Sequence, residues 1–290
     1  MNKKIIGFGL ILIAIGLIGA IAFRGDLLNG GGNPENSKIA FDKKWDFSAN
    51  QLKDIKLQGN SEDFDVTFVV SKNGSNSIEM DGDTYQENID LIQSTGIRDG
   101  EFNINLTNKK PNIQFFTIGN FKNNKINVTV TMADLNQLEE IDIETSSGSI
   151  KGKNLIARDI DVKSSSGDIR LDGVRGQEIE FKATSGNIIA SKVEGVLSAE
   201  GSSGNIEIDG VTHDAKIKNS SGNVTLEQKK SANADIKLSS GDAKVIIPKD
   251  FAGSFDLKTS SGDTSYPNTS NSSPEVIKVQ ASSGNITIKQ

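Results

Sequence analysis

The residues best suited to chemistry in this chain are one histidine and a recurring set of Asp and Asn side chains. His213 is the only histidine, and it stands beside Asp214 in the run GVTHDAK. A Ser–His–acid mechanism would need a serine nucleophile on a G-x-S-x-G elbow, and the chain contains none. We therefore predict that His213 is a turn residue, that the protein is not an enzyme, and that it uses no cofactor.

The Asp and Asn residues follow a phrase of the type Ser-Ser-Gly. Seven positions directly after the glycine of this phrase carry Asp or Asn: Asp168, Asn187, Asn205, Asn223, Asp242, Asp263 and Asn285. Regularly spaced side-chain oxygens could bind calcium or a carbohydrate. The G-G-x-G-x-D calcium motif is absent, however, and an acid occurs at only three of the seven positions. We favour a structural ladder of Asn and Asp side chains along one edge, and expect no metal site.

The glycines of the phrase set the period of the chain. They are Gly148, Gly167, Gly186, Gly204, Gly222, Gly241, Gly262 and Gly284. Their successive spacings are 19, 19, 18, 18, 19, 21 and 22 residues, and such a period is typical of stacked coils. Glycine adopts a positive φ without steric cost, so we expect it to turn the backbone at each corner.

Each phrase separates two segments in which apolar and polar residues alternate, the pattern of a half-buried β-strand. In DIDVKSSSGDIRLDGV (159–174), Ile160 and Val162 precede the phrase and Ile169 follows it. Inward positions carry similar residues in every unit, so each strand is expected to pair with its counterpart one unit later. The predicted fold is all-β: a single-stranded β-helix or β-solenoid repeat array of about eight short coils over residues 136–290.

Residues 38–135 follow a different pattern. Eight of the thirteen phenylalanines lie between positions 41 and 121, and the Ser-Ser-Gly phrase is missing. The segment predicts a β-rich N-terminal cap on the first edge of the array. Within it, NIQFFTIGNF (112–121) is expected to be a hairpin on the core of the cap, with a membrane or partner contact as the alternative. At the other end NITIKQ (285–290) has no visible cap, which predicts an open edge there and leaves the oligomeric state undecided.

The beginning of the chain is expected to hold it to a membrane. Residues 5–23 carry no charge, and at about 1.5 Å per residue they would form about 28 Å of helix. Lys3 and Lys4 precede this stretch and favour a cytoplasmic N-terminus. We predict a single-pass transmembrane anchor over 1–26, a flexible linker over 27–37 and an extracytoplasmic remainder. A cleaved signal peptide is the alternative, since AIA at 20–22 fits a cleavage site.

Charge and cysteine content narrow the function further. The formal net charge is −6, and residues 1–26 hold three basic side chains and one acidic one, so the remainder carries −8. A general nucleic-acid binder needs a basic face, so nucleic acid is excluded as a partner. The absence of cysteine excludes disulfides, thiolate metal sites and a cysteine nucleophile. The expected partners are the membrane and either an envelope protein or a cell-wall glycan.

The repeat units resemble the bacterial β-strand repeat family known as "putative adhesin", a domain of unknown function. The resemblance is carried by IDIETSSGSI (141–150), IKLSSGDAKV (236–245) and FDLKTSSGDT (255–264), although Ala133 stands where the family usually has proline. Within the family the chain is most similar to LiaG-like membrane-anchored envelope proteins. The resemblance implies an envelope scaffold or interaction module, linked to the cell-envelope stress response. The alternatives are an adhesin or cell-wall polysaccharide-binding protein and, with weaker support, a β-helix carbohydrate-active enzyme.

Overall fold

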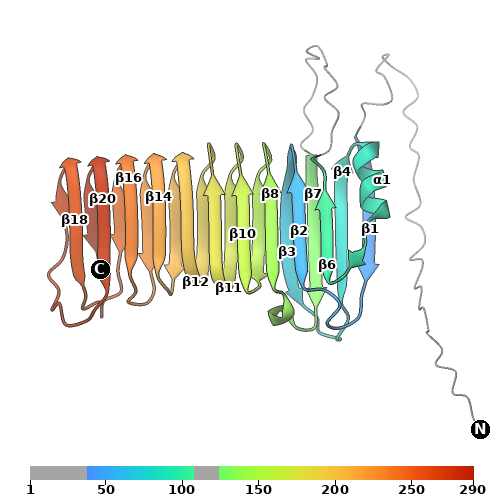
Figure 1. Cartoon of the computed structure of the whole chain (residues 1–290), viewed down its shortest axis with the longest axis horizontal. Helices are drawn as coiled ribbons and strands as arrows, with labels where there is room; N and C mark the ends of the chain where they lie inside the picture. Colours follow the sequence, from blue (N-terminus) through green and yellow to red (C-terminus); the bar gives the residue numbers. More distant parts are fainter. Residues whose placement is uncertain (1–37, 108–123) are drawn as a thin grey trace, which may run out of the picture.

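The computed structural model describes residues 38–107 and 124–290, and β-strands account for most of them (Figure 1). The expected transmembrane anchor (1–26), the linker (27–37) and the segment 112–121 lie outside the described residues. Within the described ranges no helix is long and apolar enough to cross a bilayer.

Two stacks of parallel strands, here called the first and the second sheet, make up most of the molecule. In each rung the chain runs along the first sheet, turns a corner and continues along the second. In spatial order the first sheet contains β6 (Glu101–Asn105), β2 (Asp54–Gly59), β8 (Glu140–Thr145), β10 (Asp159–Ser164), the later parts of β11 (Ile169–Ala183) and β12 (Ile188–Ser203), β14 (Ala215–Ser221), β16 (Ala234–Ser240), β20 (Val276–Ser283) and β18 (Ser254–Ser261). The second contains β7 (Asn124–Met132), β3 (Glu62–Val70), β9 (Ile150–Ile156), the earlier parts of β11 and β12, β13 (Ile206–Val211), β15 (Val224–Gln228), β17 (Ala243–Ile246), β21 (Ile286–Lys289) and β19 (Thr264–Ser265).

Equivalent residues of neighbouring rungs lie directly beside one another, which is the arrangement of a solenoid. Ile141 pairs with Ile160, and Ile160 pairs with Ile179, in one parallel register. All three are buried, while the residues that alternate with them along each strand face outward. The two-residue period therefore directs one apolar column after another into a shared core between the sheets.

The order of the rungs departs from the order of the chain at the C-terminal end. β20 pairs with β16 on one side and with β18 on the other, and β21 lies between β17 and β19. The C-terminus consequently lies one rung inside the end of the stack (Figure 1). The expectation of an open edge at NITIKQ (285–290) is therefore wrong, because β21 pairs with β17 along its length and with β19 at Ile286 and Thr287.

The inward side chains explain this exchange. The C-terminal rung presents Ile277, Val279 and Ile286 to the core, all fully buried. The rung that ends the stack presents Thr264 at the position paired with Ile286, and its second-sheet strand β19 is very short. The more apolar rung gains more by burial between two neighbours, since burial contributes about 25 cal/mol per Å² of apolar surface.

A similar exchange occurs at the N-terminal end. β2 and β3 lie between the rung of β6 and β7 and the rung of β8 and β9. The parallel stack thus extends into residues 54–132. Antiparallel strands then close it: β7 pairs with β4 (Ser77–Thr84), β4 pairs with β1 (Ile39–Asp46), and β5 (Ile97–Arg98) pairs with β6. The helix α1 (Gln86–Ser94) and the 3-10 helix η2 (Leu135–Gln137) complete the described elements.

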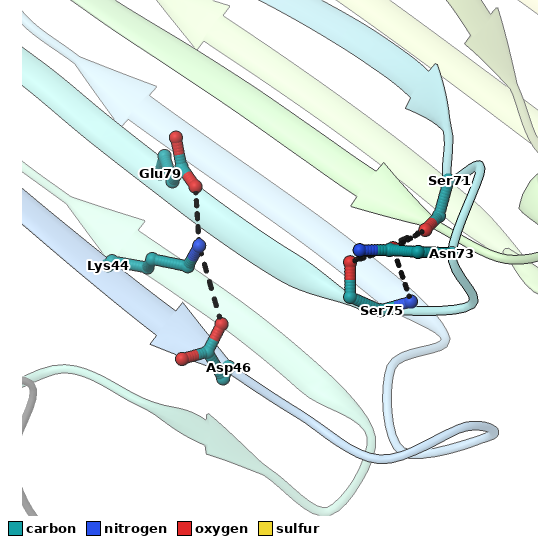
Figure 2. Close-up of polar contacts among 6 residues, drawn as sticks. All are labelled: Lys44, Asp46, Ser71, Asn73, Ser75 and Glu79. Carbon is teal, nitrogen blue, oxygen red and sulfur yellow. Dashed lines mark hydrogen bonds and ion pairs between the residues drawn. The ribbon is translucent and has the colours of Figure 1, made fainter.

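Polar contacts protect this N-terminal end. Lys44 of the edge strand β1 lies 2.8 Å from Glu79 of β4 and 3.6 Å from Asp46, as Figure 2 shows. The same view shows the turn between β3 and β4, where Asn73 accepts hydrogen bonds from Ser71 and Ser75. The indole Nε1 of Trp45 donates to the carbonyl of Thr95, directly after α1, at 2.7 Å. A charged edge strand tied to a helix discourages pairing with other chains.

Candidate binding surface

The Ser-Ser-Gly corners stack directly on one another. A methyl group added at Gly167 would lie 1.9 Å from the carbonyl oxygen of Gly148, and one at Gly222 would lie 2.2 Å from that of Gly204. Five of the corner glycines have a positive φ, namely Gly204, Gly222, Gly241, Gly262 and Gly284. The expectation of a positive φ at every corner is wrong for Gly148, Gly167 and Gly186. Close approach of the neighbouring backbone requires glycine at those three corners.

The seven Asp and Asn residues predicted as a ladder lie together along the corner edge of the second sheet. The Oδ1 of Asp168 accepts a hydrogen bond from the backbone N–H of Asn187 at 2.8 Å, and Asn187 accepts in the same way from Asn205 at 2.9 Å. The series continues in spatial order through Asn223, Asp242, Asn285 and Asp263. The bonds run mainly from backbone to side chain, so the ladder satisfies N–H groups that the corner removes from the sheet.

We expect Asn205→Ala to lower the free energy of unfolding by about 1 kcal/mol, because the backbone N–H of Asn223 loses its acceptor. Asn205→Asp keeps an acceptor oxygen at this place and should remain close to the wild type. Urea unfolding of both variants measures the difference. Equal losses in the two would show that the hydrogen bond is not what the side chain contributes.

The outward face of the first sheet carries a column of carboxylates that the sequence analysis did not single out. One carboxylate on each of five neighbouring strands contributes, in register, and we call the five the acidic column. Four of them are the first residues of their strands, and the fifth lies where β11 enters the first sheet; in spatial order they are Glu101, Asp54, Glu140, Asp159 and Glu178. Like charges directly opposite one another on adjacent strands are unfavourable. The repulsion between these carboxylates does not help the protein to fold. The column is therefore a candidate for binding a cationic partner. The signal in the sequence was an acidic residue at the start of successive strands. Asp54 and Glu101 join the column, however, only because β2 lies between β6 and β8 in the stack.

Basic side chains offset part of this charge. Lys56 lies 3.2 Å from Glu140 and 3.5 Å from Glu101, and Arg158 lies 2.9 Å from Asp159. The side chains in these contacts are partly exposed to solvent, so the ion pairs contribute little to stability.

A second row of carboxylates lies beside the acidic column, formed by Asp142, Asp161 and Glu180 in register. Partial burial, reinforced by the charge of Asp161, raises the pKa of Asp142 to about 6. Burial and the nearby Glu140 also raise the pKa of Asp54. The carboxylates of this face therefore repel one another when they are ionised, and a bound cationic group would reduce this repulsion.

Asp142→Asn should stabilise the protein near pH 7.5 and have little effect near pH 4. The pKa of Asp142 is raised in the folded state, so its contribution to stability is largest below the unfolded pKa of about 3.8 and is lost as the pH rises through about 6. The side chain is only half buried, so solvent screening reduces the gain to about 1 kcal/mol. Thermal melts across this range measure it, with Glu144→Gln on the same strand as control. A gain that does not depend on pH would contradict the assignment.

A shallow groove of about 340 Å³ lies where the acidic column ends. The strand next to Glu178 carries Val196, which is 52% exposed, at the register position of the column. The following strands carry Asp214, Asn233 and Val276 at this position, so the unbroken series of carboxylates ends here. A second, shorter ladder crosses the groove, because Asp214 accepts from the backbone of Asn233 at 2.9 Å and Asn233 accepts from that of Val276 at 2.9 Å.

The remaining candidate, His213, lies on an exposed bend between β13 and β14. Its Nδ1 is 2.9 Å from the hydroxyl of Thr212. Among the residues that the structure describes, no three His, Cys, Asp or Glu side chains are grouped as a metal site would need.

Comparison with known proteins gives one family and several similar folds. The family described as Toastrack DUF4097 matches residues 52–289. A crystal structure of a "putative adhesin" from Bacteroides fragilis is 14% identical with a TM-score of 0.53, and the similarity covers 87% of this chain and 98% of that one. A crystal structure of a "putative lipid binding protein" from Parabacteroides distasonis is 19% identical with a TM-score of 0.50, covering 86% and 97%. At these identities the likeness concerns the fold. No curated protein matches the chain.

Proposed function

The chain belongs to the Toastrack DUF4097 family, and its own strand repeats form a solenoid; we propose that it is a non-catalytic scaffold or interaction module of the bacterial cell envelope. Residues 1–26 anchor it in the membrane with the N-terminus in the cytoplasm, and the solenoid stands outside. Its working part is the outward face of the first sheet rather than a pocket. It acts in the cell's response to envelope stress.

The observation that carries the proposal is the acidic column. Five carboxylates in register, with Asp142, Asp161 and Glu180 beside them, outnumber the basic residues that contact them, namely Lys56, Arg158 and Lys163, and leave an anionic surface on the first sheet. A flat charged surface of this kind suits a protein segment with basic residues, because complementary charge fixes the position of the partner and speeds association. The uncharged stretch at 5–23 supports the membrane anchor.

In-cell photocrosslinking of the full-length protein, during treatment with an envelope-targeting antibiotic, tests this. A photoreactive residue at Glu178 should capture an envelope protein, whereas the same residue at Glu227, exposed on the second sheet, should not. Glu140→Lys combined with Asp159→Lys should abolish capture, and Glu207→Lys combined with Glu227→Lys should leave it intact. Equal capture from both sheets, or capture that survives reversal of the acidic column, would contradict the proposal.

The alternative is an adhesin or a cell-wall polysaccharide-binding protein, the first of which agrees with the name of the Bacteroides fragilis structure. Sugars stack on aromatic rings, and Tyr266 presents such a ring, 54% exposed and 5.6 Å from Phe255. Pull-down on purified cell wall separates the two functions. Retention that Tyr266→Ala removes, and that charge reversal of the acidic column leaves unchanged, would favour the alternative.

A further inference from the structure

The two ends of the stack differ in how their core is closed. The N-terminal end is covered by α1 and the antiparallel strands β1 and β4 (Figure 1). At the other end β18 pairs only with β20, and β19 pairs only with β21, within the described residues. The inward side chains Phe255 and Leu257 of β18 are consequently only partly buried, unlike their counterparts Ile277 and Val279 one rung further in.

The backbone of β18 is ready to accept another strand. Ser254 donates its N–H to the carbonyl of Glu275, on the side of β20. In a parallel ladder, alternate residues direct both backbone groups to the same neighbour. The N–H and C=O groups of Phe255, Leu257 and Thr259 therefore point away from β20, toward the free edge.

The outward side chains of β18 are complementary in charge to those of a second β18 strand that runs antiparallel to it. Asp256 and Lys258 flank Leu257 on the outer face, and their charged groups lie 3.2 Å apart. If a second β18 runs antiparallel with Leu257 opposite Leu257, each Asp256 faces the Lys258 of the other copy. This register also pairs Phe255 with Thr259, so the residues with free backbone groups meet in hydrogen-bonded pairs.

From these three features we infer that the open end binds a second copy of this chain, through antiparallel pairing of the two β18 strands about Leu257. The pair is related by a two-fold axis, so the same surface serves both partners. It joins the two cores end to end and covers Phe255 and Leu257. Tyr266, which packs against Phe255, lies at the rim of the contact. The acidic column takes no part in it, so the pairing is independent of the proposed function.

Charge reversal tests the register directly. Asp256→Lys places Lys opposite Lys in both halves of the symmetric pair, and Lys258→Asp places Asp opposite Asp. Each variant alone should dissociate with a constant raised about tenfold or more, because like charges across an interface are repulsive. A mixture of the two should associate again, because every Lys then faces an Asp. All four side chains concerned are partly or fully exposed, so the fold should tolerate the changes.

Sedimentation velocity of the full-length chain in detergent, with two differently labelled forms, gives the measurement. Lys237→Asp on β16 is the matched control. Lys237 occupies an equivalent outward position, but on a strand that already pairs with β14 on one side and with β20 on the other. We expect a dimeric wild type and control, monomeric single variants and a restored mixed dimer. A monomeric wild type, dimers that ignore the charge at 256 and 258, a mixture that stays monomeric, or a control that dissociates like the variants would each overturn the inference.

Discussion

Gly167→Ala is expected to lower the free energy of unfolding by at least about 3 kcal/mol, or to prevent folding. The added methyl group would lie 1.9 Å from the carbonyl oxygen of Gly148 and 2.7 Å from the backbone nitrogen of Ser149. Both contacts are to backbone that is itself part of the stack, so neither can rotate away as a side chain would. The two rungs must separate at this corner and lose the hydrogen bonds between them, including the one that the hydroxyl of Ser164 donates to the carbonyl of Gly148 at 3.0 Å.

Two other glycines separate this clash from backbone strain. Gly74 has a φ of +79° but open space around its Cα, so Gly74→Ala should cost only about 1–2 kcal/mol. Gly96 has neither a positive φ nor a neighbour within 4 Å, and Gly96→Ala should be close to neutral. Urea unfolding monitored by circular dichroism ranks the three. If Gly167→Ala costs no more than Gly74→Ala, the corners are not held by close backbone approach.

Phe181→Ala is expected to lower the free energy of unfolding by about 3–5 kcal/mol. Phe181 is fully buried, and its in-register neighbours are Val162 and Ala199. The small Ala199 leaves room for the ring, so truncation would place two small residues side by side and open a cavity in the column. Val196→Ala, at a half-exposed position on a neighbouring strand, should change stability by less than about 0.5 kcal/mol.

Exchanging the two sizes provides a stricter test. The double variant Phe181→Ala with Ala199→Phe restores the ring to the same column one rung away, and should recover part of the lost stability. Thermal unfolding of the two single variants and the double variant gives the coupling energy. Costs that simply add would show that the column is packed by each rung separately and not as a continuous core.

The corners and the strands around them could be predicted from residues alone. The phrase at Gly148, Gly167 and their successors recurs at a nearly constant period, and alternating apolar residues mark the buried side of most strands. Because a strand has a side-chain period of two, this pattern determines which residues point inward. The edge position of Asn187 and Asn205 follows directly from their place after the glycine.

The order in which the rungs stack was decided only by the tertiary structure. Near-identical units do not specify which copy lies beside which, since each strand could pair equally well with several others. The longer spacings of 21 and 22 residues after Gly241 leave room for the chain to pass over one rung, and the apolar C-terminal rung then takes the better-buried place. The same exchange at the other end places Asp54 between Glu101 and Glu140, and so creates the acidic column. Burial is a property of the whole stack, so it selects an order that no single repeat encodes.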